Sequence, residues 1–288
     1  MISRCVRINS YTLRVSFVVF EYSAVMSDEE KYMTVSRMLR KHLKSRETVN
    51  QLPDLALLAP HENNDEPEDC GPLPDPPFEA TLITMPPGES STIKLWLGSV
   101  SDAMYPAALR ERDVVCIINM AARQCSDIQR IEKISTECLS QWDRVSFNES
   151  WYRANLERED FTYLRVDAED HPRYKITDDF PACFELLERI ERAHNGKDVS
   201  VLVHCIQGLN RSAAICVGWL MKRHGMPLEY AIERISAKRP GILTNRSFLR
   251  QLIAYERTLH DKPVAQVPSQ PRLVSIGNVV ERLAEDIS

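Results

Sequence analysis

The sequence predicts an α/β domain in which a central, mostly parallel mixed sheet carries helices on both faces. Apolar, strand-like segments near Ile93, Val114, Phe161 and Val199 alternate with segments of helical periodicity. Strands that alternate with helices form layered sheets of this class. A cysteine-containing loop follows the last strand directly, so we expect it at that strand's carboxyl end, where ligands bind in such sheets.

The segment 177–195 illustrates the predicted helices. Its apolar residues recur every three or four positions and predict one buried stripe, formed by Phe180, Phe184, Leu187 and Ile190. We expect Thr177 to cap the start of this helix and Asn195-Gly196 to end it.

The last predicted strand, Val199–Val203, leads into the most informative stretch of the chain, His204–Ser212, and then into a helical segment, Ala213–Arg223. A strand, a tight loop and a helix start that carries Arg211 together favour a bound phosphate dianion, because loop N–H groups, the helix N-terminus and the arginine fork all attract it. The predicted phosphate ligands are the loop residues Ile206, Gln207, Gly208, Leu209 and Asn210, together with Arg211.

The same positive field stabilises a thiolate at Cys205. A free thiol has a pKa of about 8.5, whereas a thiol at a helix N-terminus beside a cation can have a pKa of roughly 3.5–7.5. Gly208 lets the backbone turn and approach the ligand. Cys205 is therefore the candidate nucleophile.

Two other cysteines stand at the same distance before an arginine, at Cys138 to Arg144 and at Cys183 to Arg189. Neither segment follows an apolar strand or contains a glycine, and both contain acidic residues, which repel phosphate: Asp143, Glu185 and Glu188. We interpret both as coincidences on surface helices.

The Cys205 loop, with Ser212 after the arginine, resembles the signature of the cysteine-dependent protein phosphatases, and within them the dual-specificity group. Four further segments resemble parts of this family in the expected order: the opening strand at Ile93–Ser99, a strand ending in asparagine at Val114–Asn119, the strand and acid loop at Tyr163–Asp170, and the closing helix motif at Arg239–Asn245 with the residues after it. The resemblance covers residues 90–261.

The resemblance implies a two-step reaction that needs neither a metal nor another cofactor. Cys205 attacks phosphorus while Arg211 and the loop amides hold the equatorial oxygens, and a general acid protonates the leaving oxygen. Water then hydrolyses the phosphocysteine, and Ser212 hydrogen-bonds the departing sulfur.

Other residues are expected to support this machinery. His204 either supports the loop from behind or is a buried histidine satisfied by the backbone. Asn119 and Asn245 either brace the loop or cap turns.

Asp170 is the candidate general acid, because the family-like strand and loop at Tyr163–Asp170 place it where the acid belongs. Such an acid accelerates cleavage by about 10²–10⁴. Asp167 and Glu169 are the alternatives, since a shift of one residue in the register of this strand would turn its side chains to the other face of the sheet.

The expected substrates are phosphoproteins carrying phosphotyrosine and phosphoserine or phosphothreonine. The uncharged loop side chains argue against a polyanionic inositol phosphate. One alternative is an RNA 5′-triphosphatase, because Gly208-Leu209-Asn210-Arg211 matches that branch better than the common Gly-x-Ser-Arg form. The other is a non-catalytic phosphoprotein-binding scaffold, against which the presence of Cys205, Arg211 and Asp170 together argues.

Composition indicates a soluble enzyme in a reducing compartment. The chain has 288 residues, 43% of them hydrophobic, a net charge of -5 and eight cysteines without close pairs. The mild charge gives no sign of a nucleic-acid surface. The apolar run Val15–Phe20 is too short to span a membrane. We expect a cytoplasmic protein, with the nucleus as a second location and mitochondrial targeting ranked below both.

The chain is predicted to have five parts. Residues 1–25 form an extension, either a presequence or a segment before a true start at Met26; residues 26–52 a helical basic segment; residues 53–89 a proline-rich acidic, disordered linker; residues 90–261 the catalytic domain; and residues 262–288 a linker with a short helix. The basic segment and linker are too short for a rhodanese-like targeting domain, which indicates an atypical family member.

The region between Asn119 and Tyr163 is longer than is usual in the family. Isoleucines spaced for one helix precede an aromatic cluster of Trp142, Phe147, Trp151 and Tyr152. This cluster is interpreted as a small satellite core, with a substrate-recognition flap as the alternative.

Overall fold

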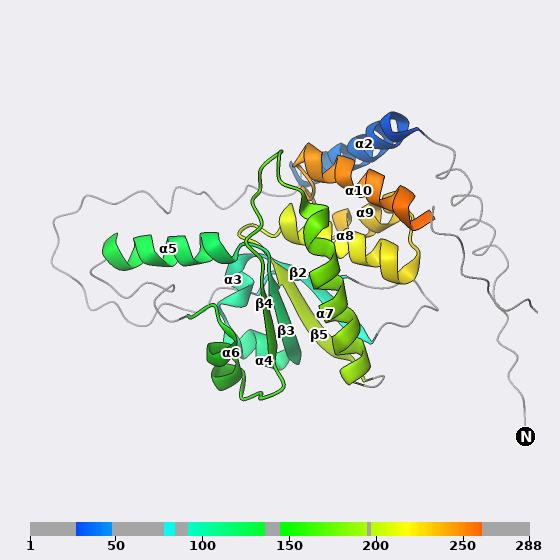
Figure 1. The fold of residues 1–288 in the computed structure, drawn as a ribbon. Coiled ribbons are helices and arrows are strands. Elements are labelled where there is room, and N and C mark those ends of the chain that lie inside the picture. The colour runs from blue at the N-terminus through cyan, green and yellow to red at the C-terminus, as the bar shows by residue number, and fades with distance from the viewer. Residues whose placement is uncertain (1–26, 48–77, 84–91, 136–144, 195–196, 261–288) are drawn as a thin grey trace, which may run out of the picture. The chain divides into compact units, whose positions relative to one another are not determined.

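The computed structural model describes residues 27–47, 78–83, 92–135, 145–194 and 197–260 (Figure 1). The chain divides into one compact unit, Met1–Glu256, and a second, Arg257–Ser288, of which residues 257–260 are described. The fold and site below belong to the first unit.

The first unit contains a mixed five-stranded sheet, which confirms the predicted fold class. Its strands are β1 (Thr81–Ile83), β2 (Ile93–Gly98), β3 (Val114–Asn119), β4 (Thr162–Arg165) and β5 (Val199–His204), in the order β1-β2-β5-β3-β4. The pairs β2–β5, β5–β3 and β3–β4 are parallel, whereas β1 runs antiparallel to β2.

The registers of the parallel strands bring their carboxyl ends to one edge of the sheet. Gly98 of β2 and Asn119 of β3 both pair with His204 of β5, and Asn119 also pairs with Arg165 of β4. Loops that follow these four residues therefore start side by side.

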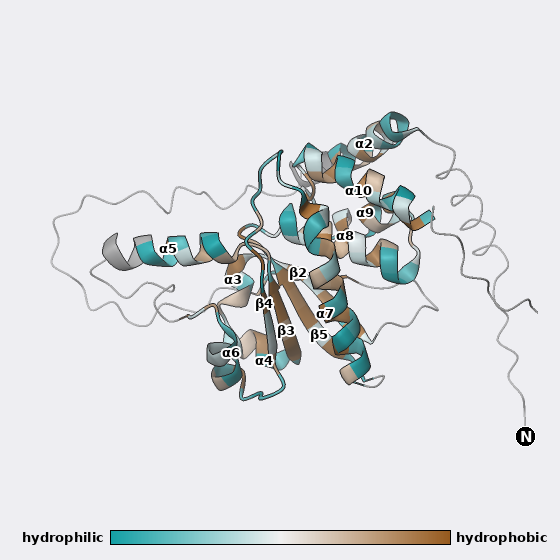
Figure 2. Cartoon of the chain, viewed as in Figure 1, coloured by the Kyte–Doolittle hydropathy of each residue, from teal (hydrophilic) through white to brown (hydrophobic). Residues whose placement is uncertain are grey.

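The two central strands form the core of the sheet. Every residue of β3 and β5 is buried, and Figure 2 shows both strands as predominantly hydrophobic. Strands that are covered on both faces have such continuous apolar sequences. These two strands could therefore be predicted although apolar and polar residues do not alternate along them.

Helices cover both faces of the sheet. They are α2 (Asp28–Glu47), α3 (Val100–Ala103), α4 (Pro106–Glu111), α5 (Ala122–Ser135), α6 (Glu149–Leu156), the 3-10 turn η3 (Ile176–Asp179), α7 (Phe180–Ala193), α8 (Arg211–His224), α9 (Leu228–Ser236) and α10 (Arg246–His260). Helices α7 and α8 contact β2, and α8 also contacts β5, while α3 and α4 contact β5 and β3; Figure 1 shows these two groups on opposite sides of the strands.

The helix predicted to start at Thr177 begins later. Residues Ile176–Asp179 form the 3-10 turn, and α7 starts at Phe180 with a proline in its first turn. Proline is favoured there because its missing N–H has no partner in a first helical turn. The predicted stripe of α7 is buried, and α8 approaches it closely at Gly218, where a Cβ would collide with the rings of Phe180 and Phe184.

The prediction that residues 53–89 are a disordered linker is wrong for its last part. Thr81–Ile83 form the edge strand β1, in which Ile83 is buried, and Phe78 stacks edge-on against Trp96 of β2. The linker prediction rested on proline content, but Phe78–Ile83 lies between two groups of prolines and contains none. The packed domain therefore begins before residue 90.

The long region after β3 contributes to the core. Tyr152 of α6 is fully buried, its ring stacks on Tyr163, and its hydroxyl donates to the carbonyl oxygen of Ala103. Trp142 lies outside the described residues. Removal of α6 would open the core, so this helix is an integral part of the domain.

Helix α2 packs on α9 through buried side chains of Tyr32, Val35 and Leu39. Lys31, which is 6% exposed, forms an ion pair with buried Glu256, and this carboxylate also accepts a hydrogen bond from Leu228 N (2.7 Å).

Among the described helices, none is long and apolar enough to cross a membrane.

Candidate active site

The loop between β5 and α8 begins at Cys205 and returns into the helix at Arg211. Gly208 has a φ of +70°, and a Cβ at this position would collide with the carbonyl of Gly98 and the guanidinium of Arg239. Only glycine combines this backbone conformation with so close an approach.

The carbonyl groups of this loop are all bonded away from its centre. The carbonyl oxygen of Ile206 accepts from Val100 N (3.1 Å), that of Leu209 from Leu243 N (2.8 Å), and those of Gln207 and Gly208 from the Arg239 guanidinium (3.1 and 2.8 Å). Since a peptide's N–H points opposite to its carbonyl, the loop presents N–H groups to its centre, which forms an anion-binding cradle.

The sulfur of Cys205 lies in this cradle. Gly208 N and Ser212 Oγ donate to it over 3.2 and 3.3 Å. Burial acts to raise the pKa of the Cys205 thiol, but hydrogen bonds from the Ser212 hydroxyl and N–H, the charge of Arg211 and the Gly208 N–H outweigh burial and lower the pKa below the ordinary thiol value.

The other cysteines in the described part of the chain differ in this respect. Cys116, Cys125, Cys183 and Cys216 are free and buried. Burial raises the pKa of Cys125 to about 11 and that of Cys183 to about 12, and raises the pKa of Cys116 and Cys216 further. Among the described cysteines, Cys205 is thus the one whose pKa is lowered.

The alternative cysteine–arginine segment at Cys183 to Arg189 forms no such loop, because it is helical. Cys183 lies in α7 and is fully buried, so the prediction of a helix is right and that of a surface position is wrong. Cys138 lies outside the described residues.

His204 supports the loop as a neutral side chain. Burial lowers its pKa to about 4. Its Nδ1 lies 3.3 Å from the carbonyl oxygen of Cys205, which can only accept, so Nδ1 carries the proton. This contact turns a fifth loop carbonyl away from the centre.

Arg211 is 4% exposed, and its Nη1 donates to the Gln124 side chain (3.0 Å) and the carbonyl oxygen of Ala168 (3.1 Å). Its buried Nε makes no hydrogen bond with the described residues. The guanidinium is therefore oriented from one side and retains a donor for a ligand oxygen.

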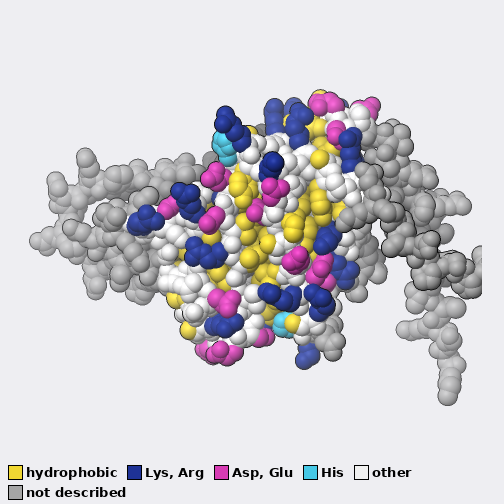
Figure 3. All heavy atoms as spheres, viewed as in Figure 1, with side chains coloured by type: hydrophobic (Ala, Val, Ile, Leu, Met, Phe, Trp, Pro, Cys, Tyr) yellow, Lys and Arg dark blue, Asp and Glu magenta, His cyan; other side chains and the backbone are white. Residues whose placement is uncertain are grey.

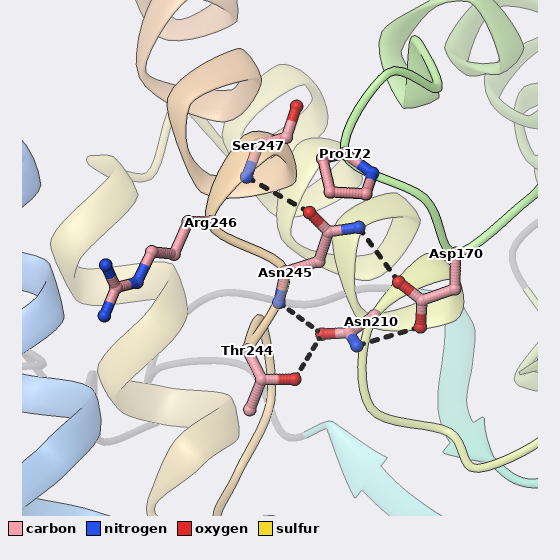
Figure 4. Close-up of a pocket in the computed structure, with 7 residues that line it drawn as sticks. All are labelled: Asp170, Pro172, Asn210, Thr244, Asn245, Arg246 and Ser247. Carbon is pink, nitrogen blue, oxygen red and sulfur yellow. Dashed lines mark hydrogen bonds between the residues drawn. The ribbon is translucent and has the colours of Figure 1, made fainter.

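Asp170 lies against the phosphate-binding loop. Its Oδ2 accepts from Asn210 Nδ2 and its Oδ1 from Asn245 Nδ2, both over 2.9 Å (Figure 4). No hydrogen bond joins Asp167 or Glu169 to the loop among the described contacts. Of the three candidate acids, Asp170 is the one that the structure brings to the cysteine loop.

The two candidate supporting asparagines have different places. Asn119 accepts from Ala121 N and donates to the Tyr163 hydroxyl, both over 2.8 Å, so its side chain braces the turn after β3. Asn245 contacts the acid and also accepts from Ser247 N (3.1 Å) at the start of α10. Asn245 therefore supports the acid loop and caps a helix start at once.

A pocket of about 520 Å³ opens beside the acid. Its lining residues are Asp170, Pro172, Asn210, Thr244, Asn245, Arg246 and Ser247. Figure 4 shows that Arg246 points away from the group formed by Asp170 and the two asparagines. Within the described residues, no group of three His, Cys, Asp or Glu side chains could hold a metal ion.

Two residues of the site were not singled out from the sequence. Arg239 was noted only as part of the closing motif, although it holds two loop carbonyls. Gln124 lies in the first turn of α5 and contacts Arg211, which stands 87 positions later. Nothing in the local sequence distinguishes an exposed glutamine of this kind from a solvated one.

Comparisons with known proteins bear on the same region. The family model of the dual specificity phosphatase catalytic domain matches residues 95–258. The chain is 35% identical over 180 residues to dual specificity protein phosphatase 14 of Homo sapiens, covering 62% of this chain and 74% of the relative. It is 36% identical over 118 residues to dual specificity protein phosphatase 18 of Rattus norvegicus, covering 41% of this chain and 56% of the relative.

Among solved structures, human DUSP28 aligns with a TM-score of 0.44 at 22% identity, covering 65% of this chain and 98% of that one. The family model spans more than half of the chain and includes the cysteine loop, the acid loop and the motif around Arg239. The chain therefore belongs to the dual specificity phosphatase family and is a protein phosphatase.

Proposed function

We propose that this phosphatase hydrolyses phosphotyrosine and phosphoserine or phosphothreonine in proteins through a phosphocysteine intermediate. The observation that carries the proposal is the sulfur of Cys205, which is buried in a ring of inward N–H groups beside Arg211 and has a lowered pKa. A lowered pKa favours the thiolate, which is the form of cysteine that attacks phosphorus.

In the first step, the Cys205 thiolate forms a bond to phosphorus as the bond from phosphorus to the leaving oxygen breaks. The loop N–H groups and Arg211 hold the three equatorial oxygens, where charge is greatest in the transition state. Asp170, which starts this step as a carboxylic acid, gives its proton to the leaving oxygen, so the product leaves as a neutral hydroxyl.

In the second step, water attacks the phosphocysteine. Asp170, now a carboxylate, takes the proton from this water, and the sulfur leaves as a thiolate. The hydrogen bond from Ser212 Oγ (3.3 Å) supports this role, because it stabilises the sulfur as its negative charge returns.

The loop side chains and the charge pattern of the face viewed in Figure 3 support a protein substrate. Ile206, Gln207 and Leu209 carry no charge, so they add no attraction for a polyanionic head group. Figure 3 shows Lys and Arg interspersed with Asp and Glu on the viewed face, a mixed pattern that differs from the basic stripe typical of RNA-binding surfaces.

Substrate class is tested by phosphate release from three matched phosphopeptides, which carry phosphotyrosine, phosphoserine or phosphothreonine in one sequence. Triphosphorylated RNA and a phosphoinositide serve as competing substrate classes, and Cys205→Ser as the inactive control. We expect release from all three peptides and none by the control. Faster release from triphosphorylated RNA, with binding that weakens steeply as salt increases, would overturn the proposed substrate class.

A further inference from the structure

The side chain of Asn210 joins the phosphate-binding loop to the acid loop. Its Nδ2 donates to Asp170 Oδ2 over 2.9 Å, while Asn245 Nδ2 donates to the other carboxylate oxygen over the same distance. Figure 4 shows the carboxylate facing both amides. Asp170 itself is exposed, so these two contacts are what fixes its direction.

The orientation of the Asn210 amide is determined by its other end. Its Oδ1 accepts from Thr244 Oγ1 and from Asn245 N, each over 3.1 Å. A flipped amide would place its NH₂ group against the Asn245 N–H and its oxygen against the carboxylate, and both contacts would be repulsive. Asn210 is 9% exposed, so water does not readily replace these partners.

Asparagine at this position is a departure from the common Gly-x-Ser-Arg form of the loop. A serine hydroxyl is a single atom closer to the backbone, whereas the amide donates to Asp170 from its nitrogen and accepts from Thr244 and Asn245 at its oxygen, so serine cannot reach both sides at once. In this sequence, one side chain of the phosphate-binding loop thus contacts the carboxylate of Asp170 itself.

We propose that Asn210 is a positioning residue that holds Asp170 over the phosphate-binding loop before the substrate binds. The inference rests on the proposed function, in which Asp170 is the general acid. Each carboxyl oxygen has two acceptor positions, so both asparagine contacts leave a position for the transferred proton. Because the acid is already oriented, binding of the substrate does not have to order it.

The test compares two leaving groups, because an acid matters most when the leaving oxygen is basic. kcat/KM is measured with phenyl phosphate, whose phenoxide is a poor leaving group, and with difluoromethylumbelliferyl phosphate, whose leaving group needs little protonation. For Asn210→Ser we expect about a 10- to 100-fold loss on phenyl phosphate, the worth of one hydrogen bond to a charged group, and little loss on the activated substrate.

Arg239→Met is the matched control. Arg239 holds the carbonyls of Gln207 and Gly208 and makes no hydrogen bond to Asp170 among the described contacts, so its replacement should lower kcat/KM equally for both substrates. If Asn210→Ser also lowered both equally, Asn210 would act on the loop and not through the acid, and the proposal would be wrong.

A double mutant separates this proposal from the proposed function. Asp170→Asn should show the leaving-group dependence by itself, and its absence would remove Asp170 as the acid and the inference with it. In the Asp170→Asn background, Asn210→Ser should cause no further loss on phenyl phosphate; an additive loss would contradict the proposal while leaving the acid assignment intact.

A second variant covers the case in which Asn210→Ser does not fold, which thermal unfolding would show. Asn210→Asp keeps the shape and the oxygen that accepts from Thr244, but sets a second carboxylate against Asp170. The added charge also repels the phosphate of both substrates, so kcat/KM should fall for both but further for phenyl phosphate, and an equal loss on both substrates would again contradict the proposal.

Discussion

The hydrogen bond from Ser212 to the nucleophile gives the sharpest prediction. Ser212 is fully buried, and its Oγ lies 3.3 Å from the sulfur of Cys205. A hydrogen bond to a charged group is worth about 1.5–3 kcal/mol, which corresponds to roughly a 10- to 100-fold change in the ratio of thiolate to thiol. Ser212→Ala should therefore raise the pKa of Cys205 while the Gly208 and Arg211 contributions remain.

The rate of alkylation of Cys205 by iodoacetamide, followed by mass spectrometry of its peptide across a pH series, measures this directly. Below the pKa of the wild type, alkylation of the variant should be slower by the stated factor; the difference should shrink between the two pKa values, and above the variant's pKa the two rates should converge. Ser236→Ala is the control, because Ser236 is equally buried but donates to the carbonyl oxygen of Glu233. Superimposable curves for Ser212→Ala and the wild type would refute the reasoning.

Three further predictions follow from named contacts. Gly208→Ala should abolish turnover with every substrate, because of the positive φ and the collision with Gly98; a kcat within a factor of about ten of the wild type would contradict the proposed cradle. Gln124→Ala should weaken inhibition by inorganic phosphate by about 2- to 10-fold, the worth of one ordinary hydrogen bond, and an unchanged inhibition constant would show that Arg211 is oriented without it. Lys31→Ala should lower the free energy of unfolding by about 3–5 kcal/mol, because it leaves Glu256 buried without its cation. Thermal unfolding measures this loss, and trypsin should then cleave within α2. An unchanged unfolding temperature would contradict the role of the pair.

Much of the fold could be predicted because it rests on local signals. The fully buried strands β3 and β5 have continuous apolar sequences, and the loop after β5 combines a cysteine, a required glycine and an arginine at a helix start. β1 was missed because a strand of three residues between proline groups has too little pattern to recognise. Its place is set by pairing with β2, which is a tertiary contact.

The site shows the same division between local and tertiary information. Cys205, Arg211 and Ser212 lie within eight positions and could be predicted together, and the resemblance of Tyr163–Asp170 to the family's acid loop then indicated Asp170. The contacts of Asp170 with Asn210 and Asn245 join residues 40 and 75 positions apart. Such contacts depend on how three loops meet at the sheet edge, so the sequence could nominate these asparagines but not assign their partners.

The central claim is that the Cys205 thiolate accepts the phosphoryl group. Acid quench within milliseconds of mixing the enzyme with a phosphopeptide labelled at its phosphate tests this claim most directly. We expect acid-stable label on the protein, located on Cys205 by mass spectrometry and absent from Cys205→Ser. Phosphate release by the wild type with no protein-bound label, or with label on another residue, would contradict the account.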